Sequence, residues 1–150
     1  MAAFSDDDDL RAECPDLFTA GVASFDDQHT EAGKLIDRAL ELAWFRKEAQ
    51  SRGVDWRDSD TDYDRDNLLS AETQLTRLAV YKVAELAARR LTGYHPDGDK
   101  WQTIREYYAK MYEAEFAAVV AFGLDYDWDE SAAIDDDERF GQFPAELVRG

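Results

Sequence analysis

Residues 75–91 read LTRLAVYKVAELAARRL, and the spacing of their apolar side chains decides the fold. These side chains recur at intervals typical of one helix face, at Leu75, Leu78, Ala79, Val83, Leu86 and Ala87. Such spacing is typical of an α-helix that buries one face. We therefore predict a helix over residues 68–91. The run TGYHPDG at residues 92–98 ends it, because Gly and Pro interrupt helices.

A second helical pattern follows this break, over residues 100–122. Its apolar stripe is rich in aromatic residues and consists of Trp101, Ile104, Tyr108, Met111, Tyr112, Phe116 and Val119. Asp97 or Asp99 can cap its start, and Gly123 ends it. Because the connection between the two helices is short, we expect them to form a hairpin.

Two more helices are predicted before this hairpin. Ser5 can N-cap a short helix whose first turn, Asp6–Asp9, places negative charge at the positive end of the helix dipole. A long helix spans residues 26–52 and ends at Gly53. The fold class that follows is all-α: a small bundle of three long helices plus a short N-terminal helix.

The chain changes character after the last helix. Residues 124–129 read LDYDWD, and the alternation of apolar and acidic residues is typical of a strand. Residues 132–134 could return as its partner, which would give a short β-hairpin-like extension. We therefore predict a helical bundle domain over residues 1–123 and an extended C-terminal arm over residues 124–150.

Acidic residues dominate the composition. The 150-residue chain has a net charge of −17, with 22 Asp, 12 Glu and only five Lys. Such a surface repels itself at low salt, but in molar salt the Debye length falls to about 3 Å and the repulsion is screened. Abundant carboxylates with scarce lysine therefore favour a salt-loaded cytoplasm, as in haloarchaea. An ordinary acidic mesophilic protein is the alternative.

The charge is unevenly distributed along the chain. Residues 1–70 carry a net charge of −10, residues 71–115 are neutral, and residues 116–150 carry −7. Like-charge repulsion between copies is least at the neutral hairpin, which makes its aromatic residues a candidate self-association surface. The alternative is an ordinary core hairpin with ion pairs along its helices.

Several function classes fit this composition poorly. Phosphate binding needs clustered Lys and Arg, and the chain has no such run. No apolar stretch reaches the roughly 18 residues of a membrane span, and the N-terminus does not read as a signal peptide. The single cysteine, Cys14, fits a small buried residue better than a nucleophile. We expect no cofactor and no enzymatic activity.

Two stretches bear on metal binding. GVASFDDQH at residues 21–29 resembles the opening metal motif of hemerythrin-like bundles, but such a site needs several histidines and this chain has only His29 and His95. His29 is therefore predicted to be an exposed residue of a first helical turn. Asp125, Asp127 and Asp129 have the spacing of a calcium loop, but Glu130 stands where glycine is required. We predict no metal site, with opportunistic cation binding by these three aspartates as the alternative.

Glu85 and Glu115 are the acidic residues nearest to the predicted core of the hairpin. Each has Arg or Lys neighbours at helical spacing. We therefore predict that they form surface ion pairs, which contribute little to stability.

Residues 70–130 resemble the head–tail connector (adaptor) proteins of tailed viruses. The parts that carry the resemblance are SAETQLTRLAVYKVAEL at 70–86, DGDKW at 97–101, a tyrosine-rich helix and LDYDWD at 124–129, in this order. Glu130 departs from the glycine usual in that family. The resemblance implies a small helical bundle whose copies, usually twelve, form a ring below the portal protein of the capsid and continue the DNA channel.

The resemblance also implies partners and contact residues. The partners would be further copies of the chain, the portal protein and the next neck or tail protein. DNA would pass through without specific binding, and the protein would be located in the virion neck after assembly in the host cytoplasm. The residues expected to contact the portal or a neighbour are Trp128, Phe140, Phe143, Leu147 and Val148. Those expected to mediate ring self-association are Tyr81, Trp101, Tyr108 and Tyr112.

Two other functions remain open at this point. The chain could be a cellular interaction module of a halophile, such as an adaptor or an antitoxin-like regulator. A metal-dependent helical enzyme is the third and least favoured possibility, because the chain lacks a histidine set.

Overall fold

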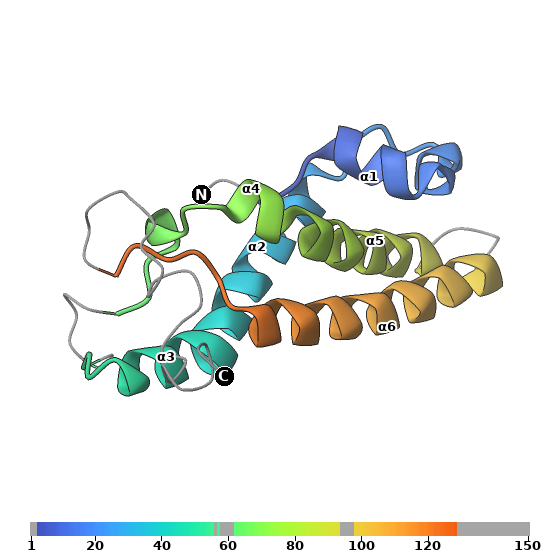
Figure 1. Ribbon diagram of the computed structural model, residues 1–150. Coiled ribbons are helices and arrows are strands. Elements are labelled where there is room, and N and C mark those ends of the chain that lie inside the picture. Colours follow the sequence, from blue (N-terminus) through green and yellow to red (C-terminus); the bar gives the residue numbers. More distant parts are fainter. Residues whose placement is uncertain (1–2, 56, 58–61, 94–97, 129–150) are drawn as a thin grey trace.

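The computed structural model describes residues 3–55, 57, 62–93 and 98–128, and within them the protein is all-α, as predicted. Helices α5 and α6 lie side by side and antiparallel, α2 crosses them, and α1 lies against α5 (Figure 1). The helices are α1 (Asp7–Glu13), α2 (Asp26–Leu40), α3 (Arg46–Ser51), α4 (Ala71–Gln74), α5 (Thr76–Thr92) and α6 (Gly98–Phe122). None of these described helices is both long and apolar enough to cross a membrane.

The short helix α1 begins with a capping box. The backbone N–H of Asp9 donates to Asp6 Oδ1 at 3.0 Å, and the backbone N–H of Asp6 donates to Asp9 Oδ2 at 3.0 Å. The hydrogen bond from the backbone of Asp9 is the main reason that the pKa of Asp6 is lowered. The prediction that Ser5 caps this helix is therefore wrong. Pro15 follows α1 and opens the 3-10 helix η1 (Pro15–Ala20).

The long helix predicted over residues 26–52 is confirmed, with one irregularity. Helix α2 continues through a π-helical turn, η2 (Glu41–Phe45), directly into α3. Trp44 and Phe45 are consecutive residues of this turn, and both are buried. The wider π turn changes the angular spacing of side chains, which fits two adjacent aromatic residues into the same core. Gly53 ends the helix with φ of 75°, a left-handed conformation that favours glycine.

The helix predicted over residues 68–91 begins later than residue 68. Leu68 forms an isolated antiparallel bridge with Tyr126, supported by hydrogen bonds from Leu69 N to Asp125 O at 2.9 Å and from Asp127 N to Asn67 O at 2.8 Å. Residues bonded in this way cannot be helical. Helix α4 therefore starts at Ala71.

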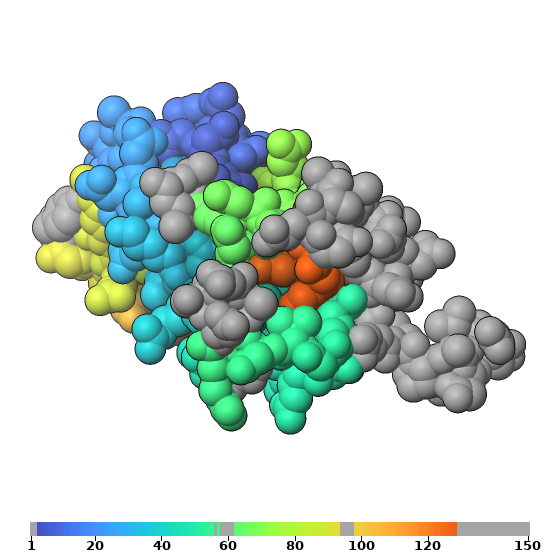
Figure 2. Space-filling model, turned by 90° about the vertical axis from the view of Figure 1, so that its left-hand side faces the viewer, coloured from blue at the N-terminus to red at the C-terminus, as the bar shows by residue number. Residues whose placement is uncertain are grey.

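The extended segment predicted after Gly123 is thus paired with residues upstream of α4. The return strand predicted at residues 132–134 lies outside the described residues. Leu124 and Tyr126 are buried, so residues 124–128 pack within the bundle instead of beginning an arm at 124. In Figure 2 this segment lies between α3 and the residues that lead into α4.

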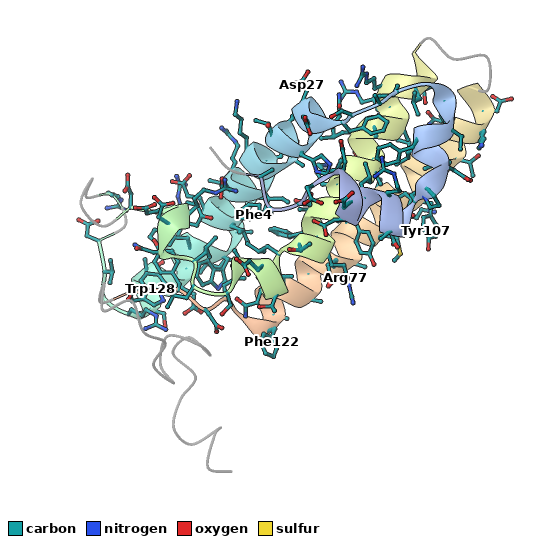
Figure 3. The ribbon with its side chains drawn as sticks, turned by 90° about the horizontal axis from the view of Figure 1, so that it is seen from above. Phe4, Asp27, Arg77, Tyr107, Phe122 and Trp128 are labelled. Atoms are coloured by element: carbon teal, nitrogen blue, oxygen red, sulfur yellow. The ribbon has the colours of Figure 1, made fainter. Side chains whose placement is uncertain are left out.

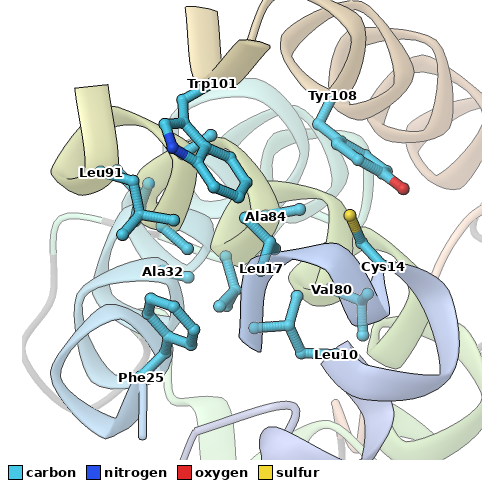
Figure 4. Close-up of a cluster of buried hydrophobic side chains, with 14 residues drawn as sticks. Leu10, Cys14, Leu17, Phe25, Ala32, Val80, Ala84, Leu91, Trp101 and Tyr108 are labelled. Carbon is cyan, nitrogen blue, oxygen red and sulfur yellow. The ribbon is translucent and has the colours of Figure 1, made fainter. Parts of the chain in front are cut away.

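The core consists of two clusters, one at each end of the bundle. The first joins α1, η1 and the start of α2 to the second half of α5 and the first half of α6 (Figure 4). The second joins the end of α2, η2 and α3 to the start of α5, the end of α6 and residues 124–128. Helix α5 contributes buried side chains to both clusters, among them Leu78 to the second and Leu91 to the first.

Candidate interaction surface

One long edge of the molecule is formed by α1, α4, α5 and α6, and it contains a hollow of about 590 Å³. The labelled residues Arg77, Tyr107 and Phe122 follow this edge in Figure 3. The residues that line the hollow come from all four helices and are Asp9, Ala12, Glu13, Thr73, Gln74, Thr76, Arg77, Val80, Tyr81 and Glu115. The edge belongs mainly to the neutral α5–α6 hairpin.

The hollow is acidic, with one cation inside it. Asp9, Glu13 and Glu115 supply three carboxylates and Arg77 supplies the guanidinium. Burial raises the pKa of Tyr81, the negative charge of Glu13 raises it further, and Arg77 partly opposes both effects. The Tyr81 hydroxyl therefore stays neutral and can donate a hydrogen bond to an acceptor in the hollow.

The residues predicted to mediate ring self-association lie in different environments. Trp101 is 1% exposed and Tyr108 is 7% exposed, and both belong to the first core cluster of the chain itself. Their burial leaves almost no surface for a second copy to contact. Tyr81 and Tyr112 are half-buried and pack against the two clusters from outside, so part of each ring remains accessible.

Exposed aromatic surface on this edge comes instead from Tyr107 and Phe122, which the sequence pattern did not select. Tyr107 is 56% exposed and Phe122 is 60% exposed. Tyr107 packs edge-on against Tyr108, with ring centroids 5.0 Å apart. The side chains of two consecutive helical residues point about 100° apart. The sequence Tyr107-Tyr108 therefore indicates that when one ring faces the core, the other lies toward the surface.

The last seven residues of α6 are apolar on all sides. Residues 116–122 read FAAVVAF and contain no charged side chain. Val119 is buried in the second cluster, whereas Ala117, Ala118, Ala121 and Phe122 are exposed. A helix that is apolar all round is normally buried on all sides. The outer face of residues 116–122 is therefore a candidate contact surface.

The contact residues predicted in the C-terminal arm are described only in part. Trp128 packs against its own chain: its ring stacks on Phe45 with centroids 5.3 Å apart, and the Arg52 guanidinium lies 4.8 Å from the ring centroid. It also contacts Tyr126 at 4.7 Å between centroids. The structure thus gives Trp128 an anchoring contact within the bundle. The other predicted residues, Phe140, Phe143, Leu147 and Val148, lie outside the described residues.

Two of the three aspartates with calcium-loop spacing are buried. Asp125 accepts a hydrogen bond from Ser70 Oγ at 2.7 Å, and Asp125 and Asp127 are each 6% exposed. Their backbones form the short ladder with residues 67–69. Asp129 lies outside the described residues. Within the described ranges no group of three or more His, Cys, Asp or Glu side chains is arranged to hold a metal ion.

His29 is buried, which corrects the prediction that it is exposed. It is 3% exposed, and its ring joins α2 to the segment before α1. Its Nδ1 lies 2.8 Å from Ser5 Oγ and its Nε2 lies 3.1 Å from Asp7 Oδ1. Asp7 Oδ1 also accepts the backbone N–H of Phe25 at 3.1 Å, which closes the network at the start of α2.

Ser5, His29 and Asp7 include the residue types of a serine hydrolase triad, but their setting is structural. Ser5 is 9% exposed. Neither the large hollow nor a smaller one of about 220 Å³ beside Phe4 and Arg65 is lined by Ser5 or His29. Within the described residues, the network's hydrogen bonds hold the N-terminal segment on α2.

Two further residues match their predicted roles. Cys14 is buried beside Tyr108 in the first cluster (Figure 4), and burial raises the pKa of its thiol, which disfavours the reactive thiolate. Glu85 forms an ion pair with Lys82 at 3.3 Å. Glu115 lines the large hollow.

Comparisons of the chain with protein-family models, with curated protein sequences and with solved structures found no match.

Proposed function

We propose that this chain is a structural virion protein, a head–tail connector whose copies form a ring between the portal and the tail or neck. The observation that carries the proposal is the segregation of charge. Residues 71–115, which include most of the α5–α6 hairpin, are neutral, while residues 1–70 and 116–150 carry net charges of −10 and −7. The hairpin also presents exposed apolar side chains. A subunit with this distribution can meet further copies through the hairpin and keep its acidic surface in salt or along DNA.

The order of elements supports the same proposal. The resemblance to connector proteins spans a long helix, a short turn, a tyrosine-rich helix and an alternating acidic segment. In the structure these parts fall on α4 and α5, on the start of α6, on the rest of α6 and on residues 124–128, which pack in the second cluster. In the proposed assembly, a ring of twelve copies continues the DNA channel, and its negative wall passes DNA without binding it.

The portal protein and the next neck protein are the partners in this proposal. The apolar residues Phe140, Phe143, Leu147 and Val148, which follow the described part of the chain, are proposed to dock on the portal. Trp128 itself is proposed to anchor residues 124–128 on the bundle, through its contacts with Phe45 and Arg52.

Cryo-electron microscopy of purified virions tests the proposal directly. We expect density for this chain at the junction of capsid and tail, in contact with the portal. Virions in which the neck contains no density for the chain would refute it. A ring of twelve 17.1 kDa chains would also exceed about 150 kDa by light scattering.

The alternative is a cellular interaction module of a halophile, for which an apolar edge on an acidic helical protein is equally suited. The two functions differ in genomic context. Genes for portal, terminase and capsid proteins beside the gene for this chain favour the connector, and their absence favours the cellular module.

A further inference from the structure

We propose that residues 62–69 and 124–128 form a strap that opens and closes over the second core cluster as one unit, and that the Asp37 carboxylate is the point on α2 that holds the strap closed. The two halves of the strap lie side by side (Figure 1). The movement does not depend on the proposed function, and it concerns the segment from which the C-terminal residues continue.

The two halves of the strap are bound to each other. Backbone hydrogen bonds of 2.8 and 2.9 Å flank the bridge between Leu68 and Tyr126. The backbone N–H of Asp64 donates to Tyr126 Oη at 3.0 Å, and the rings of Tyr63 and Tyr126 stack with centroids 6.2 Å apart. Because these contacts join one half to the other, neither half can leave the bundle alone without breaking them.

Asp37 on α2 is in contact with two polar side chains of the strap. Tyr63 Oη donates to Asp37 Oδ1 at 2.9 Å, and Arg65 Nε lies 3.1 Å from Asp37 Oδ2. The Arg65 guanidinium also lies 3.9 Å from the ring centroid of Phe4. The Arg65 side chain is 11% exposed and that of Asp37 is 15% exposed, so water reaches little of this ion pair. The strap is therefore attached to α2 through a largely buried charge.

The burial of Asp37 favours opening of the strap, and apolar packing opposes it. Desolvation raises the pKa of Asp37, and its contacts with Tyr63 and Arg65 only partly oppose this effect. The ionised carboxylate is thus held closed at a cost in solvation, and it regains water when the strap lifts away. Tyr126 is 2% exposed and Leu124 is 1% exposed in the closed state, so opening also exposes apolar surface. We therefore expect the open strap to be a minor state.

A glycine lies where the second half of the strap would bend. Gly123 has φ of 91° and separates α6 from residues 124–128. Glycine adopts backbone conformations that other residues avoid, so this position can absorb a change in chain direction. Release of residues 124–128 adds about 17 Å to the reach of the residues that follow. In the proposed connector this is extra length toward the portal.

Amide hydrogen exchange, followed residue by residue in the folded chain, tests the inference. The reporters are the backbone N–H groups of Asp64, Leu69 and Asp127, because each donates a hydrogen bond from one half of the strap to the other. If the strap opens as a unit, the three amides should share one protection factor within about threefold. This factor should be well below that of amides in the middle of α5.

Substitutions of the two partners of Asp37 should increase opening. Tyr63→Phe removes the hydroxyl that donates to Asp37 and keeps the ring. Loss of a hydrogen bond to a charged group should make all three reporter amides exchange about tenfold faster. Arg65→Gln removes the other partner and should act in the same direction. Arg38→Ala is the matched control, because Arg38 is the next residue of α2 and is exposed, and it should leave the three rates unchanged.

A double variant tests the role of the charge. In the Asp37→Asn background the Tyr63 hydroxyl meets a neutral acceptor, so Tyr63→Phe should speed exchange by only about threefold. Circular dichroism establishes that each variant keeps its helical content. An effect that remains about tenfold in this background would overturn the role of the Asp37 charge.

Two further results would overturn the strap itself. Unchanged exchange of Asp127 in the Tyr63→Phe variant would show that residues 124–128 move without residues 62–69. Reporter amides as strongly protected as those of α5 would show that the strap leaves only when the whole chain unfolds. A common, lower protection factor that falls in both partner variants supports the strap, whether or not virions contain the chain at the neck.

Discussion

His29→Ala is the substitution whose effect on stability the structure defines most closely. The change removes the ring that joins Ser5 on one side to Asp7 on the other. A neutral hydrogen bond contributes about 1 kcal/mol net, and one to a charged group about 1.5–3 kcal/mol. Ser5 Oγ is also left buried without its ring partner. Together these effects predict a loss of about 3 kcal/mol in the free energy of unfolding.

Thermal unfolding followed by circular dichroism, in about 3 M KCl at neutral pH, measures this loss. For a chain of this size, 3 kcal/mol corresponds to a fall of about 6–12 °C in Tm. Thr30→Ala is the matched control, because Thr30 is the next residue of α2 and is exposed. It should change Tm by no more than about 2 °C.

A double-mutant cycle with Ser5→Ala identifies the cause. If His29 acts through Ser5, the histidine substitution should cost about 1 kcal/mol less in the Ser5→Ala background. The reasoning is refuted if His29→Ala costs less than about 1 kcal/mol, or no more than Thr30→Ala. Additive effects of the two substitutions would show that the hydrogen bond between them contributes nothing.

Three further predictions concern the helices and the core. Trp101→Ala should lower the free energy of unfolding by about 3–5 kcal/mol, because the Trp101 ring is buried. The control Gln102→Ala, at the partly exposed neighbouring residue, should change this free energy very little. Equal urea midpoints for the two variants would contradict the prediction. Gly123→Ala should lower the free energy of unfolding by about 1 kcal/mol, because the φ of 91° at this position strains any residue that has a Cβ atom. An unchanged Tm would be inconsistent with this backbone conformation. Burial raises the pKa of Cys14 and Tyr108 in the folded chain, so the unfolded chain loses these protons first as pH rises. Stability should therefore be complete below about pH 8 and fall above it, and a Tm that is constant from pH 7 to about 11 would argue against the burial of these groups.

The long helices were predictable because their apolar side chains repeat at the helical period. The stripe that begins at Leu75 identified α5, and the stripe from Trp101 to Val119 identified α6. Periodicity gives the buried face of a helix, however, and says nothing about which parts of the opposite face a partner covers. For this reason the predicted contact residues Trp101 and Tyr108 are core residues, and Tyr107 was overlooked.

Long-range contacts account for what the sequence pattern missed. The late start of α4 follows from pairing between Leu68 and Tyr126, which are far apart in sequence. His29 is buried because the segment before α1 packs over it. The local sequence, a histidine in the acidic first turn of a helix, does not predict this burial. The contacts of Trp128 with Phe45 and Arg52 likewise join distant segments, so alternation alone could not show that residues 124–128 belong to the bundle.

Helix α5 supplies buried side chains to both core clusters, and this has a consequence for how the chain unfolds. Each end of α5 is covered by a different set of elements. When either cluster loses its packing, part of α5 therefore loses the contacts that stabilise it. The two ends of the molecule should therefore melt together in one transition. Amide hydrogens in the middle of α5 should be the last to exchange with solvent, and those of the short helix α4 among the first.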